Sequence, residues 1–301
     1  MRSVATYYLR ASSFVNKEIL GYKYFKTMFE TLTEDEFLAA IGNIRPQKVN
    51  DLFFSGLDRD RHFFEDSYKY KSIDQFNLKD TFTLTADYLR YFDPKKPLLL
   101  GYDPGNFSSI VVAQEDRRSN KLMVLKEFYA WIPKQQGDLA RQIYEFFGPY
   151  HKNKKIELYY DRAGNKKRAI QDKITTDARL LHGELRSYGF RVQMKNQRQR
   201  TIYYYEHFKL ISLILSEQLR YMPILRIDEN ECPNLRSALF LTAVNREDGK
   251  IEMDKRSERK VPYKYQASLT PQLPSALTYL LFGLYENLLP SDLKQAPDLP
   301  E

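Results

Sequence analysis

Apolar and polar positions change their period several times after residue 97. Three short apolar blocks come first, and unbroken or weakly alternating runs of this length are typical of buried strands. The turn residues Pro104, Gly105 and Asn106 separate the first two blocks, which favours antiparallel pairing. The expected strands are Leu98–Asp103, Ser109–Ala113 and Leu122–Trp131.

Helices and strands are then expected to alternate. Apolar residues spaced three and four apart predict helices, and short apolar blocks between them predict strands. The expected helices begin at Pro133, run from Ala169 to Tyr188, from Ile202 to Met222 and from Leu235 to Val244, and begin again at Pro274. The expected strands are Ile156–Asp161, Phe190–Met194 and a strand or hairpin at Lys250–Asp254. This order predicts an α/β fold with a ribonuclease H-like mixed sheet, three antiparallel strands followed by α/β alternation, flanked by helices.

A domain boundary is indicated by the segment Asp93-Pro94-Lys95-Lys96-Pro97, in which two prolines and two lysines are typical of a linker. We therefore predict an N-terminal region at residues 1–93, an α/β domain at 94–290 and a C-terminal tail at 291–301.

Composition narrows the class of partner. The chain has 301 residues and a formal net charge of +8, which suits a polyanion such as nucleic acid. No apolar run reaches the roughly 18 residues that span a bilayer, so we expect no membrane partner. Cys232 is the single cysteine, which excludes an internal disulfide, and the four histidines lack zinc-ligand spacing.

Basic residues gather near the candidate active site. We expect them to bind DNA phosphates, although a solvated charge run would have the same composition. They are Arg162, Lys166, Lys167, Arg168, Arg198, Arg200, Lys255, Arg256, Arg259 and Lys260.

Two aspartates carry the candidate chemistry. Asp103 and Asp161 each end an apolar strand, where a carboxylate is costly unless it is hydrogen-bonded, paired or metal-bound. Either one alone is more typical of a turn or helix cap, and it is the pair that favours a metal site. If their strands are neighbours, both can bind the same hard cation, Mg²⁺ or Mn²⁺, as in two-metal phosphodiester hydrolysis.

These segments resemble a known family. Leu99–Asp103 with Pro104-Gly105, and Tyr159-Tyr160-Asp161-Arg162-Ala163-Gly164-Asn165, resemble the nuclease domain of tailed-bacteriophage terminase large subunits. Glu36 to Pro46 resembles the segment that links the family's ATPase to its nuclease. Leu273-Pro274-Ser275-Ala276-Leu277-Thr278-Tyr279 resembles the start of the family's last helix.

The resemblance implies a metal-dependent endonuclease that cuts concatemeric viral DNA during genome packaging. It maps Asp103 and Asp161 onto the first two metal-binding acids. It implies double-stranded DNA, a terminase ATPase domain, the small terminase subunit and the portal as partners, in the cytoplasm of a bacterial host.

The sequence departs from the family in two places. It contains no G-x-x-x-x-G-K-[ST] phosphate loop, so we expect the ATPase core to be absent and residues 1–93 to correspond to the end of the motor region. Ser275 stands where the family's final helix has its third acid. One metal position is then expected to be weak, unless Asp254 or Glu258 supplies the missing carboxylate.

Two other functions remain open at this point. Ser275 favours a catalytically weak, DNA-binding packaging module, whereas the Asp103/Asp161 pair favours the nuclease. A resolvase- or transposase-like nuclease would share the same chemistry.

Overall fold

The computed structural model describes residues 13–31, 52–69, 83–133, 135–170, 173–195, 204–247 and 250–289. The chain divides into two compact units, Met1–Asn50 and Asp51–Glu301. The predicted boundary near residue 93 stays a prediction, and the segment Glu36 to Pro46 lies outside the described residues. Within the described ranges, no helix is both long enough and apolar enough to cross a bilayer.

The first unit contains a short 3-10 helix, η1 (Ser13–Asn16), followed by α1 (Lys17–Thr31). Gly21 interrupts α1 with a φ of 72°, a left-handed conformation that glycine adopts without steric cost.

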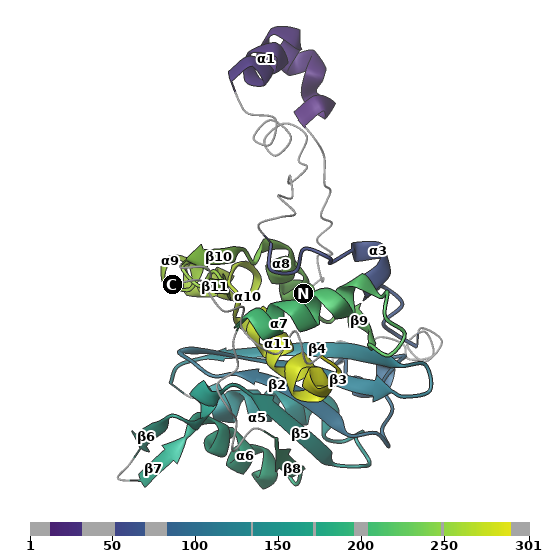
Figure 1. The fold of residues 1–301 in the computed structure, drawn as a ribbon, viewed down its shortest axis with the longest axis vertical. Coiled ribbons are helices and arrows are strands. Elements are labelled where there is room, and N and C mark those ends of the chain that lie inside the picture. Colours follow the sequence, from purple (N-terminus) through teal and green to yellow (C-terminus); the bar gives the residue numbers. More distant parts are fainter. Residues whose placement is uncertain are drawn as a thin grey trace, which may run out of the picture. The chain divides into compact units, whose positions relative to one another are not determined.

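The second unit is built on a seven-stranded mixed sheet (Figure 1). Its strand order is β1-β9-β4-β3-β2-β5-β8. The strands are β1 (Phe63–Phe64), β2 (Leu98–Asp103), β3 (Phe107–Asp116), β4 (Lys121–Trp131), β5 (Lys155–Tyr160), β8 (Arg191–Met194) and β9 (Ile224–Asp228).

The topology confirms the predicted fold class. Strands β2, β3 and β4 are sequential and antiparallel, whereas β5 runs parallel to β2 and β8 runs parallel to β5. This is the ribonuclease H-like arrangement, extended by β9, which pairs in parallel with β4.

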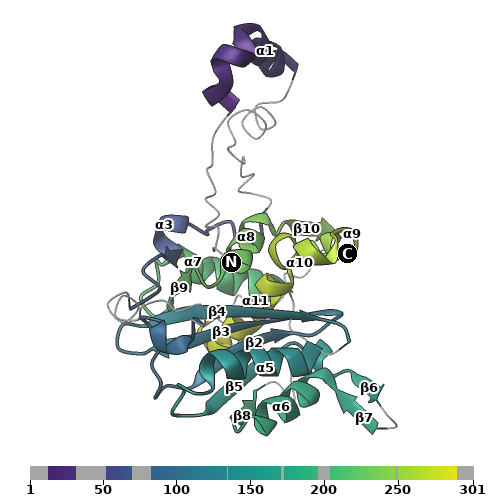
Figure 2. The ribbon, with the colours of Figure 1, turned by 180° about the vertical axis from the view of Figure 1, so that it is seen from behind.

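Helices cover both faces of the sheet (Figures 1 and 2). On one face, α5 (Gln135–Phe147) and α6 (Asp177–Ser187) bury Leu139, Ile143 and Leu181 against alternate strand residues such as Leu98, Leu100 and Tyr102. The opposite face is covered by α7 (Tyr204–Ser216), α8 (Pro233–Leu241) and α11 (Gln272–Tyr285).

The remaining elements are small. They are α3 (Arg59–His62), η3 (Ala86–Tyr88), η4 (Arg162–Asn165), the hairpins β6 (Lys167–Ile170)/β7 (Lys173–Thr176) and β10 (Val244–Glu247)/β11 (Lys250–Met253), α9 (Ser257–Lys260), α10 (Tyr263–Leu269) and η5 (Glu286–Leu288).

Three expected helices differ from the apolar pattern. Helix α8 ends at Leu241, before the expected end at Val244, which lies in β10. Two other helices are shorter than the pattern predicts. The helix expected from Ala169 begins only at Asp177, because the preceding residues pair as the β6/β7 hairpin, in which β-branched Thr175 and Thr176 favour strand. Thr176 then caps α6 by accepting a hydrogen bond from the Arg179 N–H at 3.2 Å. The helix expected to reach Met222 ends at Ser216, and Glu217 follows with a φ of 52°.

Candidate metal and nucleic-acid site

Asp103 is the last residue of the central strand β2. It is 7% exposed and lies opposite Ser109 of β3. The turn after it is held from two sides: the Ser108 hydroxyl donates to the Gly105 carbonyl at 3.1 Å, and the Gln135 amide donates to the same carbonyl at 3.1 Å. The turn that follows this carboxylate is therefore fixed before any ligand binds.

Asp161 follows β5 directly. Strands β2 and β5 are parallel neighbours, and Tyr102 of β2 is paired with Tyr160 of β5. The residues that follow this pair are Asp103 and Asp161. The chain turns at once, and the Gly164 N–H donates to the Asp161 carbonyl at 2.9 Å. Because successive residues of a strand face opposite sides, Asp103 shares the α11 face of the sheet with Gly101.

Charges converge on Asp103. Burial raises the pKa of its carboxyl to about 7, the nearby ammonium of Lys255 opposes this rise, and the negative charges of Glu258 and Asp161 add to it. An acid that is hard to ionise and surrounded by other acids is stabilised by a cation.

Glu258 is the third acid in this group, and it comes from α9. Its Oε1 atom is buried and has no hydrogen-bond partner among the described residues. Burial raises the pKa of this carboxyl, while Lys255 and Arg259 lower it. The sequence suggested Glu258 only as a replacement ligand, because nothing in the local pattern separates it from a solvated charge.

Ser275 lies in α11 and is 2% exposed. Its hydroxyl contacts the Met253 sulfur at 3.8 Å. Within the described ranges, no group of three or more His, Cys, Asp and Glu side chains is arranged to hold a metal ion. The described chain thus brings two strand-end aspartates and one nearby glutamate into the same region without completing a closed ligand set.

The predicted DNA-binding residues fall into three groups. Arg162, Lys166 and Lys167 are exposed beyond Asp161, on the way to the β6/β7 hairpin. Arg168 lies in β6, and its side chain is outside what the structure describes, as are Arg198 and Arg200 altogether.

The third group follows the β10/β11 hairpin, and residues 257–260 within it form the single helical turn α9. Lys255 acts on the pKa of Asp103 and Glu258, so it lies among the acids. The Arg256 guanidinium donates to Asp254 at 2.7–3.0 Å, whereas Arg259 and Lys260 are exposed.

A cleft of about 600 Å³ adjoins the acids. One wall is the β2–β3 turn with Gly105 and Asn106, and the other is formed by α9 and α10, including Glu258 and Gln266. Sequence reasoning missed this cleft, because α10 was not predicted.

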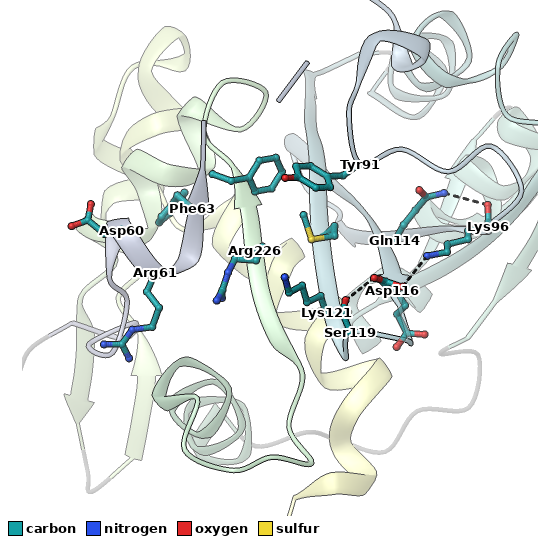
Figure 3. Close-up of a pocket in the computed structure, with 13 residues that line it drawn as sticks. Asp60, Arg61, Phe63, Tyr91, Lys96, Gln114, Asp116, Ser119, Lys121 and Arg226 are labelled. Carbon is teal, nitrogen blue, oxygen red and sulfur yellow. Dashed lines mark hydrogen bonds and ion pairs between the residues drawn. The ribbon is translucent and has the colours of Figure 1, made fainter. Parts of the chain in front are cut away.

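A second cavity, of about 660 Å³, lies at the opposite end of the sheet, where β3 ends and β4 begins (Figure 3). Its charged side chains are largely paired: Lys96 contacts Asp116 at 3.4 Å, and Arg226 donates to Glu217 at 2.5 Å. This cavity is slightly larger than the cleft, but it lies away from the acids. We therefore assign the candidate chemistry to the cleft beside Asp103.

Comparisons with known proteins concern the fold. No family model matches the chain, and no curated protein matches it in sequence. Among solved structures, it is similar to the large terminase of a thermophilic bacteriophage, with 10% identity over 90% of this chain and a TM-score of 0.47. The chain spans about half of that protein, 53% of its length.

Two further similar structures are nuclease domains. The large terminase nuclease of the thermophilic phage G20c with bound cobalt has 13% identity over 77% of this chain and 96% of that one, with a TM-score of 0.40. The large terminase nuclease domain of bacteriophage SPP1 with bound Mn has 13% identity over 68% of this chain and 93% of that one, with a TM-score of 0.38.

Proposed function

We propose that this chain is a divalent-metal-dependent endonuclease that cuts double-stranded DNA, with Asp103 and Asp161 holding the metal. The observation that carries the proposal is the register of β2 and β5, which places Asp103 at the end of β2 and Asp161 directly after β5, at the same end of two neighbouring strands. A carboxylate pair of this kind is the donor set that Mg²⁺ and Mn²⁺ prefer.

The chemistry of the surrounding residues fits such a cation. Burial makes the ionised form of Asp103 costly, and the buried Oε1 of Glu258 has no hydrogen-bond partner among the described residues. Asp103 and Asp161 would hold the metal, with Glu258 able to approach from α9. Two bound ions would supply Lewis-acid stabilisation of the attacking and leaving oxygens of a phosphodiester.

Exposed basic residues near the acids would hold the DNA backbone. Arg162, Lys166 and Lys167 follow Asp161 in the chain, and Arg259 and Lys260 line the cleft. Contacts of this type position a duplex without reading its sequence. The motif resemblance adds a biological role for the nuclease: cutting concatemeric viral DNA during packaging, with an ATPase domain, a small terminase subunit and a portal as partners.

A catalytically weak DNA-binding module is the second candidate. It is favoured by the lack, within the described part of the chain, of a group of three metal-binding side chains, and by the neutral Ser275 in α11.

Nicking of supercoiled plasmid in Mn²⁺ or Mg²⁺ tests the proposal. We expect Asp103→Asn and Asp161→Asn each to abolish nicking while DNA binding and the melting temperature are preserved. Asp116→Asn, at the opposite end of the sheet, is the matched control and should nick like the parent. If Asp103→Asn still nicks, or if the parent binds DNA but never cuts it, the nuclease proposal is wrong.

A further inference from the structure

A residue in the wall of the cleft beside the acids has a buried acceptor atom that nothing in the described structure satisfies. Gln266 is 6% exposed and lines this cleft. Its amide nitrogen donates to the backbone carbonyls of Glu258 and Val261, at 3.3 Å each. That orientation leaves Oε1 as the acceptor, and Oε1 has no partner among the described residues.

A buried acceptor without a donor is destabilising, and a ligand carrying an N–H group can supply the missing hydrogen bond. The carboxamide is a neutral group at the wall of the cleft, so it suits a polar ligand edge better than it suits a phosphate. The cleft's volume of about 600 Å³ is in the range of small-molecule sites.

An exposed aromatic side chain stands at the same cleft. Tyr263, the first residue of α10, is 57% exposed and lines the cavity next to Pro262. Phe107, the other aromatic lining residue, offers no free face because it is 4% exposed and stacks on Tyr129 with ring centroids 5.5 Å apart. Tyr263 is therefore the platform on which a flat ligand could stack.

Cations complete the cleft. Arg259 and Lys260 line it and are exposed, and neither forms an ion pair within the described residues. An aromatic platform, a hydrogen-bond acceptor and flanking cations are the elements that bind an unpaired nucleotide through its base and backbone.

We propose that this cleft receives an unpaired nucleobase of the DNA strand, stacked on Tyr263 and donating to the Gln266 carbonyl oxygen. The inference rests on the proposed nuclease function and specifies its substrate: DNA that is locally unpaired beside the scissile phosphate. In an intact duplex the bases are stacked and paired, so extruding one is unfavourable, and least so where the base has no partner.

Binding, measured without cleavage, tests this. Fluorescence anisotropy with the full chain in Ca²⁺ would compare an intact duplex with the same duplex carrying a short single-stranded gap. We expect the parent to bind the gapped DNA more tightly. Tyr263→Ala should lose that preference, a drop of about tenfold, since stacking one base contributes about 1–3 kcal/mol. Tyr263→Phe should keep it.

The controls separate stacking from a general loss of aromatic surface. Tyr221→Ala removes a tyrosine that is 51% exposed but lies next to the β3–β4 turn, where the Asn120 amide donates to the Arg220 carbonyl. It should bind both DNAs like the parent. Gln266→Met, which removes the acceptor, should weaken binding to gapped DNA alone.

Equal affinity of the parent for intact and gapped DNA would overturn the inference, as would an unchanged preference in Tyr263→Ala. These outcomes are independent of the nuclease proposal. If the parent nicks plasmid but Tyr263→Ala keeps the preference for gapped DNA, only the cleft inference is wrong. If Tyr263→Ala loses that preference but the parent never cuts DNA, only the nuclease proposal is wrong.

Discussion

Gly101 of β2 lies directly beneath Ala276 of α11: a Cβ atom on Gly101 would be 2.1 Å from the Ala276 carbonyl oxygen. That oxygen belongs to helix backbone and cannot rotate away. The close approach seats α11 on the strand that ends at Asp103, two residues further on. A glycine in the middle of a buried strand therefore sets the height of the helix above the candidate site.

Gly101→Ala should destabilise the protein by about 1–3 kcal/mol, because the added methyl forces helix and strand apart. Thermal or urea unfolding measures this. Gly183→Ala is the matched control: Gly183 lies in α6, and a Cβ there meets nothing within 4 Å. It should raise stability by about 0.5–1 kcal/mol, since alanine is the better helix former. Equal effects of the two changes would contradict the close contact.

The sequence predicted the central strands because their apolar runs are short, buried on both faces and separated by turn residues. Leu98, Leu100 and Tyr102 pack on one helical layer while Leu99 packs on the other. Two strand-end aspartates followed from the same runs, and their adjacency in space needed only the ribonuclease H-like strand order.

The missed elements depend on tertiary contacts. Strand β9 is five residues long and gains its definition by pairing with β4 and β1, which lie far away in sequence. Glu258 and Gln266 belong to α9 and α10, whose polar sequences give no apolar stripe to follow. The position of Glu258 near Asp103, and of Gln266 in the wall of the cleft, depends on how these helices pack after the β10/β11 hairpin, which a one-dimensional pattern does not contain.

Asp228 gives a pH prediction away from the candidate site. It is 1% exposed, and burial raises the pKa of its carboxyl from 3.8 to about 6. Its Oδ1 accepts hydrogen bonds from the Ser67 hydroxyl at 2.6 Å and from the N–H groups of Asn230 and Glu231 at 3.0 Å each. Asparagine can keep all three bonds, so Asp228→Asn removes only the ionisation.

Between about pH 4 and pH 6 the folded protein keeps the Asp228 proton while the unfolded chain has lost it. Raising the pH through this window therefore favours unfolding, and above about pH 6 the loss is constant. The difference between a pKa of 3.8 and one of about 6 corresponds to about 3 kcal/mol of unfolding free energy.

Asp228→Asn should match the parent's free energy of unfolding near pH 4 and exceed it by up to that amount at neutral pH. Urea titrations across the window measure it, with exposed Asp60→Asn as control. A pH-independent gap would contradict the assignment.

The basic residues after the hairpin should contribute unequally to DNA affinity. Arg259 and Lys260 are exposed, whereas Arg256 is held by Asp254. Each lost phosphate contact lowers the slope of log affinity against log salt by about 0.9, so the double variant Arg259→Ala/Lys260→Ala should lower it by about 1.8. Arg256→Ala should change it little. Binding isotherms on one duplex at several salt concentrations measure the slopes, and equal slopes for both variants would indicate a merely solvated charge run.

Two positions are candidates for the third metal ligand, Glu258 and position 275, and each predicts a different result. Glu258 acts on the pKa of Asp103 and has an unsatisfied buried oxygen, whereas the Ser275 hydroxyl lies against the Met253 sulfur. If Glu258 completes the site, Glu258→Gln should raise the Mn²⁺ concentration for half-maximal nicking about tenfold or more, because a neutral amide is a weaker ligand for a hard cation. Calorimetric Mn²⁺ titration without DNA should show the same loss of affinity, which separates metal binding from catalysis.

Adding Ser275→Asp to Glu258→Gln should not restore either value, and should lower the melting temperature, because it buries a charge in an apolar contact. Full rescue by Ser275→Asp would instead place the third ligand on α11, where the terminase resemblance puts it, and would reduce Glu258 to a neighbouring charge.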